Sequence, residues 1–164
     1  MKMALFFIPA LLGLALDLLT KKMAFEYIRA VEPSTRSVEW IPDFLYMTEA
    51  YNTGVAFGML QGHNSWLGIF VLVMAIGLPI YTWLNRHEGS LFLFGMGLVY
   101  GGALGNLHDR WVHSHVRDFI DVRLGSWNYP VFNGADSFIC IGVACLLLEQ
   151  ILSWHSSKKM VEQG

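Results

Sequence analysis

The sequence predicts an all-α integral membrane protein with four transmembrane helices, a short interfacial helix and a small β-sheet. The 164 residues are 54% apolar and 15% Asp, Glu, Lys and Arg, whereas a soluble domain has about 25% charged residues. The chain also contains four apolar runs long enough to cross about 30 Å of hydrocarbon. The high apolar content excludes intrinsic disorder, and a net charge of −2 provides no basic field for binding nucleic acid.

We interpret the chain as one membrane-embedded domain over residues 1–164. The first apolar run does not end in a small-residue cleavage site, so we expect a retained helix and not a cleaved signal peptide. Each of the four runs contains at most one charged residue. The predicted spans cover residues 3–20, 65–84, 91–107 and 137–154.

Two long connections separate these spans, residues 21–64 and 108–136. Four spans place both connections on one side of the membrane and both termini on the other. Basic residues are more numerous on the side of the two long connections, which by the positive-inside rule would place the termini outside, but several have acidic neighbours, so their distribution leaves the orientation open. In the first connection, Met23–Ala30 can form a short amphipathic helix at the interface. Ser37–Gly58 mixes β-branched and aromatic residues with Pro and Gly, which predicts short strands.

The cysteines and the clustered histidines do not predict a disulfide or a metal site. Cys140 and Cys145 point about 140° apart on a helix, because each residue turns the helix by about 100°. We interpret both thiols as small, buried apolar groups. His108, His113 and His115 lie close in sequence but lack a spacing that converges on a metal ion, so we expect interfacial imidazoles.

Aspartates provide the main functional signal. Ionisable groups at membrane depth are costly and usually face the bundle interior with a partner. Five of the six Asp residues lie within or beside the predicted spans, gathered towards one end: Asp17, Asp109, Asp118, Asp121 and Asp136. Residues spread through several spans would instead favour a proton or ion transporter.

Asp118 in VRDFID and Asp136 in FNGADSFI are candidates for a catalytic pair. The segment between them is rich in turn residues, so it can return the chain and place both carboxyl groups at one depth. Two close carboxyls share a proton, which lets one act as a general base on water while the other donates to a carbonyl oxygen. An alternative for Asp136 is the N-cap of the fourth span.

Two further stretches lie near these aspartates. In GGALGNLHDR, the glycines allow close helix approach, and Asn106, Asp109 and Arg110 share one helix face. For Asp109, a structural ion pair with Arg110 is the interpretation that we favour. In AYNTGVAFGM, Asn52 and Gly54 are typical of a turn.

Together these stretches resemble the bacterial lipoprotein signal peptidases, the type II signal peptidase family. The resemblance covers nearly the whole chain and includes, in family order, Asp17 four residues before Lys21, NTGVAFG, GGALGNLHDR, VRDF and FNGADS. Gly134 and His108 depart from the usual residues at their positions, and neither removes a motif residue.

The resemblance implies an aspartyl endopeptidase of the bacterial cytoplasmic membrane, a multi-pass protein with both termini in the cytoplasm. The active site and the small sheet would face the extracytoplasmic side. The substrate would be a prolipoprotein with a diacylglyceryl-modified Cys, cut just before that Cys. Membrane lipids and these precursors are the implied partners, with no metal or organic cofactor. A small four-span transporter and a non-catalytic scaffold are the alternatives.

The resemblance also implies roles for individual residues. Asp118 and Asp136 would be the catalytic pair. A second group would bind substrate or support the pair: Asn52, Gly54, Asn106, Arg110, Asn133 and Ala135. A third group would be structural polar residues near the site: Asp17, Lys21 and Asp109.

Overall fold

The computed structural model describes residues 2–54 and 64–162, and this part of the chain forms four helices and four strands. The helices are α1 (Ala4–Val31), α2 (Asn64–Leu84), α3 (Ser90–His113) and α4 (Gly134–Glu162). The strands are β1 (Ser37–Ile41), β2 (Leu45–Asn52), β3 (Val116–Leu124) and β4 (Trp127–Asn128). The protein is therefore mostly helical with a small sheet, as the sequence predicts.

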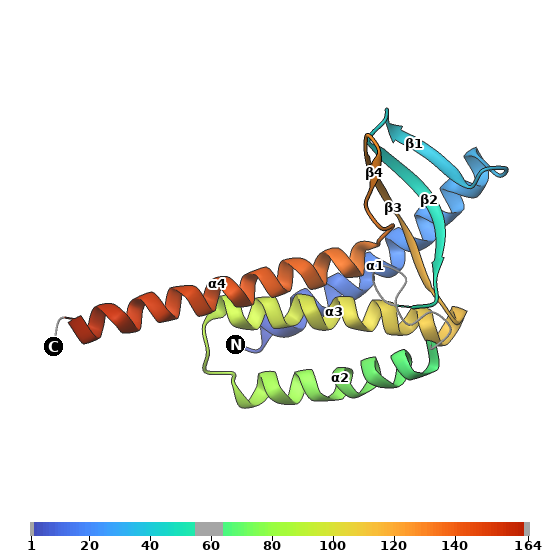
Figure 1. The fold of residues 1–164 in the computed structure, drawn as a ribbon. Coiled ribbons are helices and arrows are strands. Elements are labelled where there is room, and N and C mark those ends of the chain that lie inside the picture. Colours follow the sequence, from blue (N-terminus) through green and yellow to red (C-terminus); the bar gives the residue numbers. More distant parts are fainter. Residues whose placement is uncertain (1, 55–63, 163–164) are drawn as a thin grey trace.

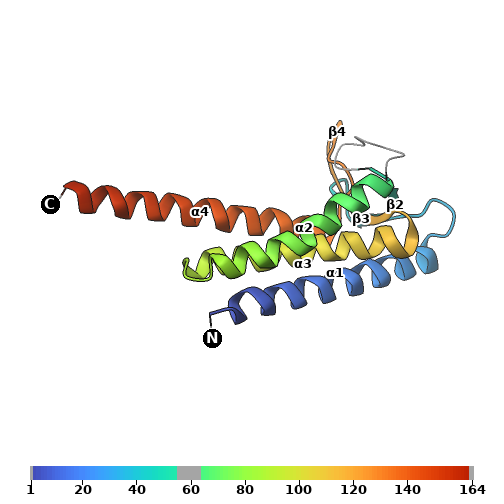
Figure 2. The same ribbon diagram turned by 90° about the horizontal axis from the view of Figure 1, so that it is seen from below.

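Helix α3 occupies the centre of the bundle and contacts α1, α2 and α4 (Figures 1 and 2). The sheet lies at one end of the bundle, beside the C-terminal part of α1 and the start of α4. The start of α1 and the end of α4 both lie towards the opposite end. The sheet and the two chain ends are thus separated by the length of the helices.

Three described helical segments are long and apolar enough to cross a membrane: Ala4–Val31, Ser90–His113 and Gly134–His155. In α2, which corresponds to the expected span over 65–84, Leu72–Leu84 is apolar but shorter. Large apolar side chains such as Leu11 are exposed along the helices, as expected for surfaces that contact lipid. The four-span count stays a prediction.

Helix α1 is longer than its predicted span. It continues to Val31, so the separate interfacial helix expected over Met23–Ala30 is wrong and these residues form the end of α1. The sequence contains no Gly or Pro between residue 20 and Val31, and this extension has its own apolar contacts. Its buried side chains pack against Phe119 of β3; they are Ala24, Phe25 and Ile28.

An ion-pair cluster also attaches the sheet to α1. Glu49 of β2 accepts hydrogen bonds from Arg29 of α1 (Nη2 to Oε1, 2.8 Å) and from Arg36 (Nη1 to Oε2, 2.8 Å). The hydrogen bonds from Arg29 are the largest cause that lowers the pKa of Glu49, to about 2. Glu49 is therefore ionised at neutral pH and holds the sheet against α1.

The sheet is antiparallel, with strand order β1-β2-β3-β4. Met47 pairs with Ile120 and Ala50 pairs with Asp118, so β2 contains one extra residue, a β-bulge, opposite β3. After β4 the chain returns to β3 through a bridge between Phe132 and Ile120. This return brings the start of α4 next to Asp118, as the turn-rich segment predicts. Strands β1 and β2 confirm the expected strands up to residue 52; residues 55–58 lie outside the described residues.

Glycines bring α3 very close to α1. A Cβ atom at Gly97 or Gly101 would overlap the carbonyl oxygen of Phe6 or Ala10 on α1, and one at Gly105 would overlap the Asp17 carboxylate. The three glycines are spaced by four residues and form one groove on α3. This close contact places the polar residues of α1 against the end of α3.

We expect Gly101→Ala to reduce the free energy of unfolding by about 1–3 kcal/mol, because the added methyl group overpacks the α1–α3 contact. Gly77→Ala is the matched control, since a Cβ there has nothing within 4 Å. Thermal unfolding in detergent should show a lower midpoint for Gly101→Ala alone. Equal midpoints for both variants would contradict the close-packing account.

Candidate active site

Asp118 lies on β3 and is 2% exposed. Its Oδ1 accepts a hydrogen bond from Nδ2 of Asn133 (2.6 Å), and its Oδ2 accepts one from Nδ2 of Asn52 (3.1 Å). Both carboxyl oxygens are therefore held by side-chain amides from other elements. The structure brings together three residues that the sequence assigns to the site.

Asp136 lies in the first turn of α4 and forms a reciprocal cap with Asn133. The backbone N–H of Asp136 donates to Oδ1 of Asn133 (3.1 Å), and the N–H of Asn133 donates to Oδ2 of Asp136 (3.1 Å). Asn133 thus caps the helix and Asp136 is its reciprocal partner, so the alternative of Asp136 as the N-cap itself is wrong. Its Oδ1 accepts a hydrogen bond from Nδ2 of Asn106 (2.9 Å).

The side chain of Asn133 connects the two aspartates. It is fully buried, donates to the carboxylate of Asp118 and accepts from the backbone of Asp136. Its Nδ2 also donates to Oδ1 of Asn106 (3.1 Å), the residue that contacts the Asp136 carboxylate. Two acidic side chains from β3 and α4 therefore belong to one hydrogen-bonded network.

Burial is the largest cause that raises the pKa of Asp118, to about 7, and the nearby charge of Asp136 acts in the same direction. Hydrogen bonds from Asn52 and Asn133 and the charge of Lys21 oppose the shift. The carboxyl of Asp118 thus changes its protonation state close to neutral pH. Such a group can donate or accept a proton under physiological conditions.

Lys21 determines how Asn106 is oriented. Its buried ammonium group donates to Oδ2 of Asp17 (2.7 Å) and to Oδ1 of Asn106 (2.9 Å), and lies 3.2 Å from Oδ2 of Asp109. An ammonium group can only donate, so it contacts the amide oxygen of Asn106 and leaves the NH₂ group to face Asp136. The positive charge of Lys21 therefore aligns an amide donor with one of the candidate catalytic carboxylates.

Asp17 ties α1 to the start of α4. Its Oδ1 accepts the backbone N–H of Ala135 (2.7 Å), while its Oδ2 binds Lys21. Ala135 is fully buried and contributes its backbone to this contact, which supports the turn that carries Asn133 and Asp136. Asp17 and Lys21 are thus brought to the site, as the sequence predicts for structural polar residues.

Asp109 pairs with a residue that the sequence reasoning missed. The guanidinium of Arg117 lies 2.7 Å from Oδ1 of Asp109, and its backbone N–H donates to Oδ2 (3.0 Å). The expected ion pair with Arg110 is wrong, because adjacent side chains on a helix point in different directions. Side chains alternate along β3, so Arg117 points away from Asp118. This alternation was the sequence signal that Arg117 is free to pair with another aspartate.

Arg110 holds the turn that presents Asn52. Its Nη2 donates to the carbonyl of Gly54 (2.8 Å), and the N–H of Gly54 donates to Oδ1 of Asn52 (2.9 Å). This contact confirms the predicted turn. The buried Nε of Arg110 has no hydrogen-bond partner among the described residues. The rest of this motif, including Phe57, lies outside the described residues.

The cysteines and the clustered histidines lie outside the hydrogen-bonded network of the two aspartates. Both cysteines are free, but Cys140 is exposed, so its expected burial is wrong; it lies on the outward side of α4. The ring centres of His113 and His115 lie 6.1 Å apart. Within the described residues, no group of three His, Cys, Asp or Glu side chains is placed to hold a metal ion.

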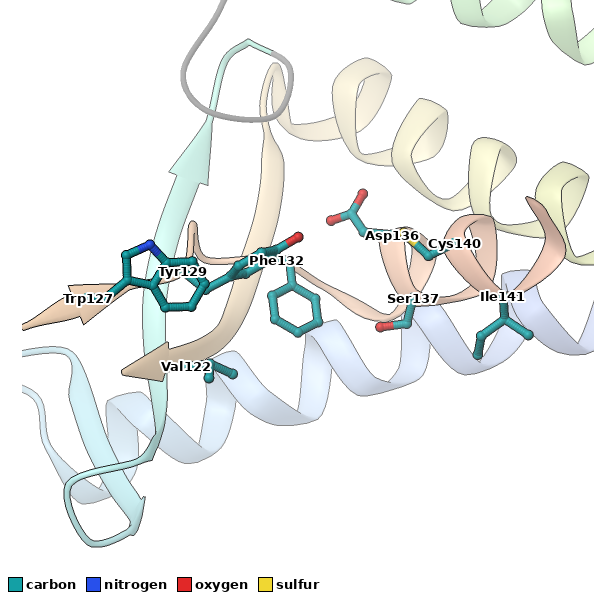
Figure 3. Close-up of a pocket in the computed structure, with 8 residues that line it drawn as sticks. All are labelled: Val122, Trp127, Tyr129, Phe132, Asp136, Ser137, Cys140 and Ile141. Carbon is teal, nitrogen blue, oxygen red and sulfur yellow. The ribbon is translucent and has the colours of Figure 1, made fainter. Parts of the chain in front are cut away.

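A cavity of about 390 Å³ opens beside Asp136, between the sheet and the first turns of α4 (Figure 3). Its sheet side carries the aromatic rings of Trp127, Tyr129 and Phe132. Cys140 lies across from them on α4. The candidate catalytic carboxylate thus borders a space that is mainly apolar.

The chain is similar to known proteins over most of its length. A family described as signal peptidase (SPase) II matches residues 9–152. Lipoprotein signal peptidases of Gloeobacter violaceus and Coxiella burnetii (strain RSA 493) are each 38% identical over 148 residues. These alignments cover 90% of this chain and 82% of the first protein, and 88% of both this chain and the second.

A solved structure described as a bacterial membrane enzyme, determined by the in meso method at 2.3 Å, matches with a TM-score of 0.76 and 32% identity. The match covers 92% of this chain and 89% of that one. Sequence and fold thus agree over most of the molecule. The chain belongs to the signal peptidase II family of membrane proteases.

Proposed function

We propose that this protein is an aspartyl endopeptidase that removes the signal peptide from diacylglyceryl-modified prolipoproteins, cutting just before the lipidated Cys. The observation that carries the proposal is the buried network in which Asn133 joins Asp118 and Asp136. Membership of the signal peptidase II family supplies the substrate class. The carboxyl pair supplies the chemistry of peptide hydrolysis.

In this mechanism the two aspartates take different roles. Asp118, whose pKa is raised to about 7, holds a proton and donates it to the oxygen of the scissile carbonyl. Asp136 accepts a proton from a water molecule, which attacks the carbonyl carbon. When the tetrahedral intermediate collapses, Asp136 passes that proton to the leaving amine of the Cys and Asp118 recovers its own. The peptide bond is cleaved with net consumption of one water.

Arg110 and Asn106 support the reacting groups. Arg110 holds the Asn52 turn through Gly54, and its buried Nε, which has no partner within residues 2–54 and 64–162, suits a carbonyl oxygen of the substrate backbone. Asn106 donates a hydrogen bond to Oδ1 of Asp136 and thereby fixes the orientation of this carboxylate. Both residues then act by positioning the substrate and the base.

The proposed location is the bacterial cytoplasmic membrane, with both termini in the cytoplasm and the sheet at the extracytoplasmic face. The separation of the sheet from the two chain ends supports placing them on opposite sides of the membrane, and the family resemblance supplies which side is cytoplasmic. Acyl chains anchor the substrate by about 0.8 kcal/mol per buried CH₂. The scissile bond would therefore be presented at the membrane interface, at the same end of the helices as Asp118 and Asp136.

We expect Asp118→Asn and Asp136→Asn each to reduce cleavage of a lipidated precursor by at least about 10³-fold, because an amide can neither accept nor donate the catalytic proton. Asp43→Asn is the matched control, since Asp43 is exposed in the β1–β2 turn. The measurement is the mobility shift of the precursor on a gel, normalised to folded enzyme. Near-normal cleavage by either site variant would refute the assignment.

Protein stability should report the raised pKa of Asp118. Between about pH 4 and pH 7 the folded state binds more protons than the unfolded state, so this group lowers stability as pH rises, by up to about 1.4 kcal/mol per unit. Asp118→Asn removes this contribution and should gain stability relative to the wild type from pH 5 to pH 8. Thermal unfolding of both proteins at the two pH values checks this. An equal difference in stability between Asp118→Asn and the wild type at pH 5 and at pH 8 would contradict a raised pKa of Asp118.

A further inference from the structure

The cavity beside Asp136 has an aromatic side formed by consecutive ring contacts. The rings of Trp127 and Tyr129 lie 5.8 Å apart, and those of Tyr129 and Phe132 lie 5.6 Å apart, both edge to face. Cys140 and Ile141 of α4 form the opposite side (Figure 3). The shape and lining suit an apolar chain lying between the sheet and the helix.

The only carboxylate among the described lining residues, Asp136, lies at one end of the cavity, whereas the aromatic side carries the indole N–H of Trp127 and the hydroxyl of Tyr129. Asp136 and Ser137 border the cavity at the start of α4. The hydroxyl of Ser137 donates to the backbone carbonyl of Asn133 (3.2 Å), so it needs no partner from a ligand. A ligand can therefore place a polar group near the Asp136 carboxylate while the rest of the cavity offers mainly apolar contacts.

The open side of the cavity is continuous with the apolar surface of α4. Cys140 and Ile141 are exposed, and farther along the same helix Leu147 and Leu148 are exposed as well. In a membrane this face contacts hydrocarbon. A chain can then enter the cavity sideways from the lipid without crossing the buried polar network.

We propose that this cavity binds an acyl chain of the diacylglyceryl group on the substrate Cys, an inference that rests on the proposed function. The thioether is on the residue directly after the scissile bond, so its lipid must start beside the catalytic carboxylates. Cys140 lies one helical turn from Asp136, about 6 Å along the axis, and borders the path of that chain. Cys140 is thus a specificity-determining residue.

The competing occupant is a segment of the signal peptide. A peptide backbone in this space would bring N–H and C=O groups that need hydrogen-bond partners. Besides Asp136 and Ser137, the described lining offers only the Trp127 indole N–H and the Tyr129 hydroxyl for such a backbone, whereas an acyl chain needs no hydrogen-bond partner. The lining therefore favours the acyl chain.

The test compares Cys140→Trp with Leu148→Trp on synthetic lipopeptides that carry either two palmitoyl or two butanoyl chains. The indole at position 140 fills the cavity, so we expect the KM for the long-chain substrate to rise about tenfold or more and the short-chain KM to change less than about twofold. Leu148→Trp adds the same bulk on the lipid face away from the cavity and should change neither KM.

If Cys140→Trp raises the KM equally for the long-chain and the short-chain substrate, or raises neither, the acyl-chain assignment is overturned. Failure of the wild type to cleave either lipopeptide would instead refute the proposed function, so the two failures are distinguishable. Leader peptides with altered side-chain size provide a third comparison. If the rise in KM caused by Cys140→Trp depends on the size of the leader side chains and not on the acyl length, the cavity binds the signal peptide and the proposal is overturned.

A binding measurement keeps the proposal falsifiable if Cys140→Trp does not fold. The chain has two cysteines, so in Cys145→Ala the thiol of Cys140 is the only one that a lipid-soluble maleimide can label. We expect the dipalmitoyl peptide to slow labelling at least about fivefold by covering the cavity, while the same peptide with Ser in place of the lipidated Cys, which has neither lipid nor thiol, leaves the rate unchanged. Equal protection by both peptides, or by neither, would refute the proposal.

Discussion

The buried ammonium group of Lys21 is the interaction on which the arrangement of the site depends. It contacts Asp17 on its own helix and both Asn106 and Asp109 on α3. A charge in this position is costly unless it is paired and hydrogen-bonded, and removing one partner of a buried pair costs about 3–5 kcal/mol. The close approach of α1 to the glycines of α3 makes this pairing possible.

The same contacts extend from the bundle to the two aspartates. Asp17 binds the backbone of Ala135 at the start of α4, while Asn106 passes the orientation set by Lys21 to Asp136. On the sheet side, Arg117 binds Asp109 and so fixes the strand that carries Asp118. The site is therefore assembled from α1, β2, α3, β3 and α4, and each element depends on a contact with another.

Much of this arrangement could be predicted from the sequence because strong physical signals carried it. Long apolar runs predicted the helices, and turn residues between Asp118 and Asp136 predicted a connection that returns the chain. The partner of Asp109 was not predictable from helix spacing, because Arg117 reaches it from a strand after a change of direction. The capping role of Asn133 was missed because Asp136 is also a common capping residue.

The extension of α1 and the exposure of Cys140 depended on tertiary contacts. Residues 21–31 are more polar than the preceding span, but their buried face packs on the sheet, which the local pattern does not reveal. Cys140 lies in an apolar run that forms a membrane helix, and in such a helix the face towards the bundle and the face towards lipid are both hydrophobic. Sequence periodicity therefore does not distinguish a thiol that faces lipid from one that faces the bundle.

The most direct test of the account is infrared titration of the purified protein in lipid, which distinguishes a protonated carboxyl from a carboxylate by its C=O stretch. The account predicts a protonated buried carboxyl that loses its proton near pH 7 and is absent from Asp118→Asn. Asp43→Asn should retain the band. Complete ionisation of all buried carboxyls by pH 5, or an unchanged band in Asp118→Asn, would contradict a proton held at Asp118.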